Sequence, residues 1–154
     1  MAHKCKVFLI VVAFFFTGLY ANSNNDLMQD IQNNFGKPTS QQQKESLMSF
    51  DKAVKLYNDG KTEEAGEAFL SLFLKGDFES SPYLADIFGL GLAPAKQNCR
   101  LGAYFLYAGI SNNLCSSYNK LIEWIEKGVC SNLTAKEKEQ RKEKYKVKLN
   151  ECTN

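Results

Sequence analysis

The chain has 154 residues, with 19 basic and 17 acidic side chains, and this length fits one compact domain rather than several. Its only histidine is His3. If the N-terminus is removed as a leader, the mature chain has no imidazole, which excludes a Ser-His-Asp or Cys-His relay and removes the commonest nitrogen ligand of zinc. Loss of Lys4 and Lys6 would leave 17 basic against 17 acidic residues, a balance that does not favour nucleic-acid binding.

The N-terminal 23 residues have the three-part pattern of a secretory signal peptide. A basic start is followed by the apolar residues 7–16 and by the small residues of Ala21-Asn22-Ser23, which predicts a signal peptide over residues 1–23 and one mature domain over residues 24–154. A retained membrane anchor is the competing interpretation. The apolar run is short for a span, which needs about 20 apolar residues, so we expect a secreted or periplasmic protein with no membrane span after leader removal.

Four cysteines remain once Cys5 leaves with the leader. An even number of cysteines in an exported chain indicates two disulfides. Successive cysteines lie 16, 15 and 22 positions apart, without the close pairs that zinc sites use. We therefore expect no metal and no cofactor. The four residues are Cys99, Cys115, Cys130 and Cys152.

The first half of the mature chain shows helical periodicity and no convincing strand. A short helix is expected over Asn24–Phe35, before Gly36 and Pro38. A second is expected to open at Gln41 and to end at Asp59-Gly60. A third should begin with Thr62 as its N-cap and close at Gly76. The apolar stripe of the second helix consists of Leu47, Phe50, Val54 and Tyr57, and that of the third of Ala65, Ala68, Phe69, Leu72 and Phe73.

The next predicted unit starts at Ser81-Pro82, a capping hydroxyl followed by a proline in the first turn. Its buried face should contain Tyr83, Leu84, Ile87 and Phe88. Glycines and a proline over residues 89–94 predict a loop that runs to about Asn98. The following segment, Leu101–Ile110, is apolar on all sides, which predicts a central helix.

Two more helices are expected at the C-terminus. One covers Cys115–Lys127, with Trp124 off the apolar stripe formed by Tyr118, Leu121, Ile122 and Ile125. The last begins at Thr134, which forms a capping box with Glu137, and continues through a Lys- and Glu-rich run to about Asn150.

Helices of this length joined by short turns must lie antiparallel to bury their apolar stripes, either as stacked hairpins or as a bundle. In that order the start of the 101–110 helix lies beside the end of the 115–127 helix. The start of the 115–127 helix lies beside the end of the last one. Of the three possible connectivities, this arrangement predicts Cys99–Cys130 and Cys115–Cys152.

Residues Tyr57–Ala65, followed by Ala68-Phe69, resemble the turn between the two helices of a tetratricopeptide repeat. Gly76-Asp77, the Leu84–Phe88 helix, the Gly89–Pro94 loop and the helix over residues 98–109 are similar to the related Sel1-like repeat. The resemblance covers about residues 50–113. It implies an all-α fold of stacked antiparallel helical hairpins that presents a concave surface to peptides or proteins, with envelope or host interaction as the setting of exported bacterial examples.

Three aromatic residues are candidates for partner binding: Trp124, Tyr107 and Tyr83. Aromatic side chains are enriched at binding hot spots, although at helical spacing they can equally belong to the core. Glu63 and Glu64 are interpreted as partners of a helix dipole rather than as a catalytic pair. We therefore expect no enzyme but an exported protein-interaction module whose protein or peptide partner the sequence does not identify. The alternative is a small secreted hydrolase that uses carboxylates alone, for example on glycan.

Overall fold

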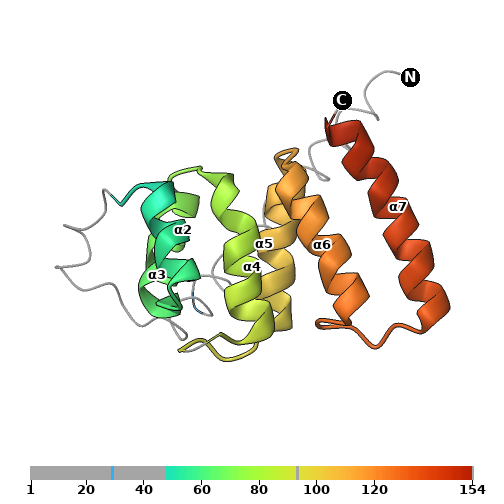
Figure 1. Ribbon diagram of the computed structural model, residues 1–154, viewed down its shortest axis with the longest axis horizontal. Coiled ribbons are helices and arrows are strands. Elements are labelled where there is room, and N and C mark those ends of the chain that lie inside the picture. The colour runs from blue at the N-terminus through green and yellow to red at the C-terminus, as the bar shows by residue number, and fades with distance from the viewer. Residues whose placement is uncertain (1–28, 30–47, 93, 154) are drawn as a thin grey trace, which may run out of the picture. The chain divides into compact units, whose positions relative to one another are not determined.

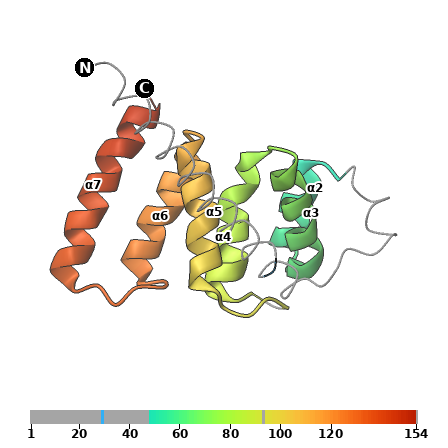
Figure 2. The same cartoon turned by 180° about the vertical axis from the view of Figure 1, so that it is seen from behind.

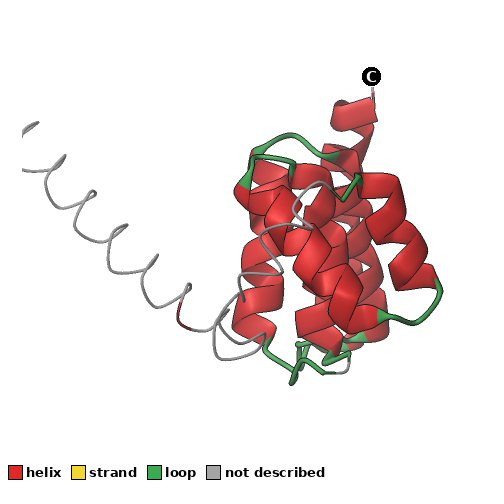
Figure 3. Ribbon diagram, turned by 90° about the vertical axis from the view of Figure 1, so that its left-hand side faces the viewer, coloured by secondary structure: helices red, strands yellow, loops and turns green. Residues whose placement is uncertain are grey.

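The computed structural model describes Gln29, residues 48–92 and residues 94–153. Figure 1 colours these residues by their position in the chain and draws the others in grey. The chain divides into two compact units, Met1–Lys37 and Pro38–Asn154, and the account below concerns the second. The described part of this unit is helical and contains no strand (Figure 3). The predicted signal peptide lies outside the described residues. So does the predicted helix over residues 24–35, except for Gln29, which is helical.

The first hairpin of the unit is formed by α2 (Phe50–Asn58) and α3 (Thr62–Leu74). The expected opening of α2 at Gln41 is wrong, because Met48 and Ser49 are not helical. Ser49 instead caps the helix by accepting a hydrogen bond from the Lys52 backbone N–H at 3.4 Å. The N-cap of α3 is Lys61 rather than Thr62, which is its first helical residue.

An aromatic cluster joins this hairpin to the next helix. The rings of Phe69 and Tyr83 stack with centroids 4.5 Å apart, and Phe50 and Tyr57 pack edge-on against both of them at 5.4–6.4 Å. Edge-to-face and offset pairs at these distances add to the apolar area that the rings bury. The cluster thus fixes α2 and α3 on the following helix.

That helix, α4 (Ser81–Leu90), follows a 3-10 turn over Phe78–Ser80. The predicted capping role of Ser81 is wrong, because the residue is already helical and its buried hydroxyl has no hydrogen-bond partner among the described residues. The sequence predicts that the helix ends before Gly89, but Gly89 lies within it. The helix ends one residue later, and Gly91 caps it in the left-handed conformation at φ +68°.

The remaining helices are α5 (Cys99–Ser111), α6 (Cys115–Lys127) and α7 (Ala135–Thr153). Asn98 caps α5 by accepting a hydrogen bond from the Leu101 N–H at 3.0 Å. The bounds of α6 are the predicted ones. The capping box of α7 is confirmed, because the Thr134 N–H donates to the Glu137 carboxylate at 2.9 Å and the Glu137 N–H donates to the Thr134 hydroxyl at 3.4 Å.

The helices pack as consecutive hairpins, α2 on α3, α4 on α5 and α6 on α7, with α3 against α4 and α5 against α6. Opposite views show α2, α4 and α6 following one another across the unit (Figures 1 and 2). The two disulfides join Cys99 to Cys130 and Cys115 to Cys152, with Cα atoms 5.4 and 5.7 Å apart. The predicted antiparallel order and pairing are therefore confirmed.

The core lies around α4 and α5. Apolar side chains from four helices are fully buried there, and the largest of them are Phe69, Phe88, Phe105, Leu84, Ile87, Leu101 and Leu106. In contrast, α7 has no buried residue. It rests on α6 through a half-buried stripe spaced four and three apart, formed by Lys138, Lys142, Tyr145, Leu149 and Cys152. Among the described residues, no helix is both long and apolar enough to cross a membrane.

Candidate functional site

The most unusual polar residue of the fold is Asp86, the single charged residue of the otherwise apolar helix α4. The residue is 6% exposed. A buried carboxylate is costly unless it is paired and hydrogen-bonded. Its surroundings therefore decide what it does.

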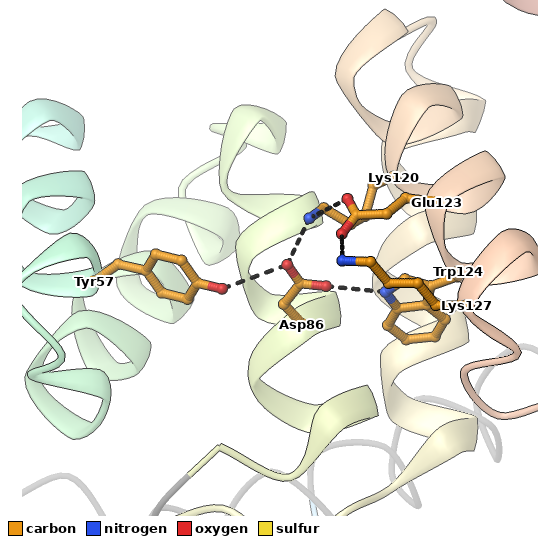
Figure 4. Close-up of polar contacts among 6 residues, drawn as sticks. All are labelled: Tyr57, Asp86, Lys120, Glu123, Trp124 and Lys127. Atoms are coloured by element: carbon orange, nitrogen blue, oxygen red, sulfur yellow. Dashed lines mark hydrogen bonds and ion pairs between the residues drawn. The ribbon is translucent and has the colours of Figure 1, made fainter.

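Three side chains from two other helices donate to this carboxylate (Figure 4). The Trp124 Nε1–H donates to Oδ1 at 2.9 Å, and the Lys120 ammonium donates to Oδ2 at 2.6 Å. The Tyr57 hydroxyl donates to the same Oδ2 at 3.4 Å. Because Tyr57 lies on α2 and the other two donors on α6, the carboxylate joins the first helices of three consecutive hairpins.

The network continues along α6 through Glu123. Its carboxylate accepts from Lys120 at 2.8 Å and from Lys127 at 2.6 Å. These two contacts lower the pKa of Glu123. Burial disfavours the charged form of Lys120, but its hydrogen bonds to Asp86 and Glu123 and their negative charges outweigh burial, and the pKa of Lys120 is raised. The ammonium group therefore stays protonated in the network.

Tyr57 lies beside the same carboxylate, but its phenol would become negatively charged on ionisation, whereas the Lys120 ammonium is positively charged. Burial of the phenol, followed by the negative charge of Asp86, raises the pKa of Tyr57 to about 12. The positive charge of Lys120 opposes this effect without reversing it. The phenol stays neutral and serves as a hydrogen-bond donor at physiological pH, which is what a carboxylate neighbour requires.

The indole of Trp124 reaches Asp86 because two glycines make room for it. A Cβ on Gly89 would overlap the far edge of the ring, and one on Gly102 would come 2.6 Å from its Cη2 atom. These glycines lie on α4 and α5, so the indole fills a gap where three helices meet. Trp124 is consequently only 4% exposed.

The three predicted partner-binding residues lie in different environments. Trp124 belongs to the core, which is the alternative that the sequence left open, so its indole is not available to a partner in this structure. Tyr83 is half-buried and stacked on Phe69. Tyr107 is 53% exposed on α5. Of the three, Tyr107 alone presents most of its ring to solvent.

Sequence reasoning missed Asp86, Lys120 and Tyr57 as a group. The available signal was a lone aspartate in the apolar segment Ser81–Leu90, because such a residue requires partners from elsewhere in the fold. Neither Lys120 nor Tyr57 carries a comparable local signal, since both belong to amphipathic helices where a lysine and a tyrosine are ordinary.

The chemistry of this network is that of a structural crosslink. The Asp86 side chain is 9% exposed and that of Lys120 is 21% exposed. Each side chain of the group has a hydrogen-bond or ion-pair partner within the group. Among residues 48–92 and 94–153, no group of three or more His, Cys, Asp or Glu side chains is placed to hold a metal ion. Comparison of the chain with protein-family models, with curated proteins and with solved structures found no match.

Proposed function

We propose that the chain is an exported helical-repeat protein that acts as a protein–protein interaction module. The observation that carries the proposal is the order of three consecutive antiparallel hairpins, α2–α3, α4–α5 and α6–α7. Stacked helical hairpins of this kind form extended surfaces that suit protein partners. The resemblance of residues 50–113 to tetratricopeptide and Sel1-like repeats supports the same function.

Two further features support export and binding. The two disulfides are typical of proteins that work outside the reducing cytosol, in agreement with the predicted leader and with an envelope or host-facing setting. The Asp86 network holds the first helices of the three hairpins in one register. A surface built on helices fixed in this way is preorganised, which reduces the ordering cost of binding.

Site-specific photocrosslinking tests this function. A photoreactive phenylalanine analogue is placed, one position at a time, at the large exposed apolar residues Leu74, Leu90, Tyr107 and Val147, which are 44–58% exposed. The tagged protein is expressed in its native host and irradiated. We expect a discrete protein adduct from at least one position, reduced by an excess of the untagged chain, with the partner identified by mass spectrometry.

The absence of any competable adduct from all four positions would contradict the interaction function. Turnover of a glycan substrate, abolished by changing a single exposed carboxylate, would instead support the carboxylate-dependent hydrolase. Glycan turnover is measured on the purified chain. Circular dichroism of each purified crosslinking variant distinguishes a failed crosslink from a misfolded sample.

A further inference from the structure

The polar groups on the side of α2, α4 and α6 largely satisfy one another. Asp86, Lys120, Glu123 and Lys127 form one connected set of ion pairs. A partner that used these charges would first have to break contacts of 2.6–2.8 Å. Specific recognition by charge is therefore better supplied by a part of the unit whose cations have no carboxylate partner.

Such a part lies where α5 and α7 approach each other. Tyr104 and Tyr107 are three positions apart on one face of α5 and are 38% and 53% exposed. The end of α7 lies against the turn after α5, where the Cys152 Sγ atom is 3.2 Å from the Asn113 carbonyl oxygen, and Tyr145 of α7 is the main influence that raises the pKa of Tyr107. We call the group of Tyr104, Tyr107 and Tyr145, with Arg141 and Lys144, the tyrosine surface.

The rings of the tyrosine surface are held in place by their neighbours. Tyr104 packs edge-on against Phe73 of α3 at 6.3 Å and against Phe105 at 5.5 Å. Exposed aromatic rings with few freely rotating bonds supply contact area at a small entropic cost, which is why tyrosine is frequent in binding sites.

The charge beside these rings is positive and is not neutralised by ion pairs. Arg141 and Lys144 both act electrostatically on Tyr107, and the Lys144 ammonium lies 6.0 Å from the centre of the Tyr145 ring. Neither cation forms an ion pair with a described carboxylate, although Arg141 also acts on Glu137, whose carboxylate is hydrogen-bonded to Thr134. The other lysines of this half of α7 are paired with glutamates: Lys142, Lys146 and Lys148.

We propose that the tyrosine surface binds an acidic segment of a partner protein, in which carboxylates face Arg141 and Lys144 and an apolar side chain lies on the rings of Tyr104 and Tyr107. The proposal rests on the interaction function proposed above and names its surface and partner class. Charge complementarity selects the carboxylates. Two cations interleaved with aromatic rings fit a mixed acidic and apolar segment, whereas recruitment to an anionic membrane uses clusters of about 4–8 basic residues.

An NMR titration of the isotope-labelled, disulfide-bonded mature chain tests the proposal. The probe is the synthetic peptide Glu-Glu-Leu-Phe-Glu-Glu, with Gln-Gln-Leu-Phe-Gln-Gln as the neutral control. We expect chemical-shift changes centred on Tyr104, Tyr107 and Tyr145, with affinity at least about tenfold lower for the neutral peptide and reduced by salt.

Charge-matched variants identify the surface. Arg141→Gln with Lys144→Gln should weaken binding of the acidic peptide at least about fivefold. Lys52→Gln with Lys96→Gln, which removes the same charge from exposed positions of α2 and of the α4–α5 loop, should leave it unchanged. The Tyr107→Ser variant should lose affinity for both peptides. All five substituted positions are exposed, and unchanged spectra elsewhere verify the fold.

Several results would overturn the assignment: no shift changes at millimolar peptide, changes centred outside the tyrosine surface, or equal weakening by the two charge-matched variants. Stronger binding to vesicles of anionic phospholipid or to heparin than to the acidic peptide would replace the protein segment by a membrane or a glycan. Competable crosslinks from Leu74, Leu90 or Val147 but none from Tyr107 would leave the interaction function in place and remove this surface.

Discussion

Loss of the Cys115–Cys152 disulfide should release α7 while leaving the rest of the fold assembled. The helix buries no residue completely, and its contacts with α6 come from a half-buried stripe that includes two lysines. Its attachment therefore depends on the covalent bridge near its C-terminus more than that of any other described helix. The matched perturbation is loss of Cys99–Cys130, which joins the start of α5 to the turn after α6.

The two bridges are nearly equal in the chain-entropy model. They close loops with sequence separations of 37 and 31 residues, and for both lengths the model gives about 4 kcal/mol of stabilisation at 25 °C. Any clear difference between the two variants must therefore come from packing in the folded state. The helices joined by Cys99–Cys130 contribute buried Leu101, Phe105, Trp124 and Ile125, which hold them together without the bridge.

Native-state hydrogen exchange separates the two cases. In the Cys115→Ser, Cys152→Ser variant we expect amides of α7 to exchange at rates approaching those of an unprotected helix, while α4 and α5 keep most of their protection. In the Cys99→Ser, Cys130→Ser variant, protection should fall in α4, α5 and α6 together through global unfolding. Retained protection of α7 in the first variant would refute the reasoning, because the half-buried stripe would then suffice to hold the helix.

Three further predictions concern the Asp86 network. Trp124→Ala should lower the free energy of unfolding by about 3–5 kcal/mol, measured by urea denaturation, because it opens a cavity and removes a donor from Asp86; a loss below about 1 kcal/mol would contradict burial of the indole. Gly89→Ala should cost more than about 2 kcal/mol because its Cβ overlaps the indole ring, whereas Gly60→Ala, at φ +77° in open space, should cost only about 1 kcal/mol of backbone strain. The folded-state pKa of Tyr57 is raised to about 12 from 10.0, so its contribution to stability is complete below pH 10 and is lost as the pH rises toward 12. In urea denaturation at alkaline pH, the free energy of unfolding of Tyr57→Phe should therefore fall less steeply with pH than that of the wild type. Identical falls in the two proteins would refute the raised pKa.

The parts of the fold that follow local rules could be predicted from the sequence. The bounds of α6 and the Thr134–Glu137 capping box depend on residues within one or two turns of each other. The disulfides join residues 31 and 37 positions apart, and their pairing follows from the antiparallel order that short turns impose on amphipathic helices. The predicted start of α2 lies too early in the chain, because apolar periodicity continues upstream through Leu47. Ser49 is the better signal for the start of the helix, because its hydroxyl accepts a hydrogen bond from the N–H of Lys52, three residues later.

The burial of Trp124 could not be predicted in this way. Its position off the stripe of α6 indicates exposure, but Gly89 and Gly102 on two other helices open the space that it fills. Its hydrogen-bond partner lies 38 positions away in the chain. The periodicity of one helix contains no information about space left by glycines on neighbouring helices. From sequence alone, a glycine in an apolar helix can therefore mark either the end of the helix or a close contact with another side chain.

The geometry of the Asp86 network also explains how the hairpins keep their register. Lys120 and Trp124 are four positions apart and so lie on one face of α6, one turn from each other. They donate to different oxygens of the same carboxylate, Oδ2 and Oδ1. Sliding α6 along α4 by one turn would bring at most one of them to Asp86 and would move the indole out of the space beside Gly89.

Apolar packing alone tolerates such shifts more readily, because many aliphatic contacts are nearly interchangeable. A buried charge with two fixed donors is not, since an unpaired carboxylate in the core costs several kcal/mol. The charged residue of α4 thus selects one stacking of the hairpins, and the tyrosines of α5 and α7 are positioned by that choice.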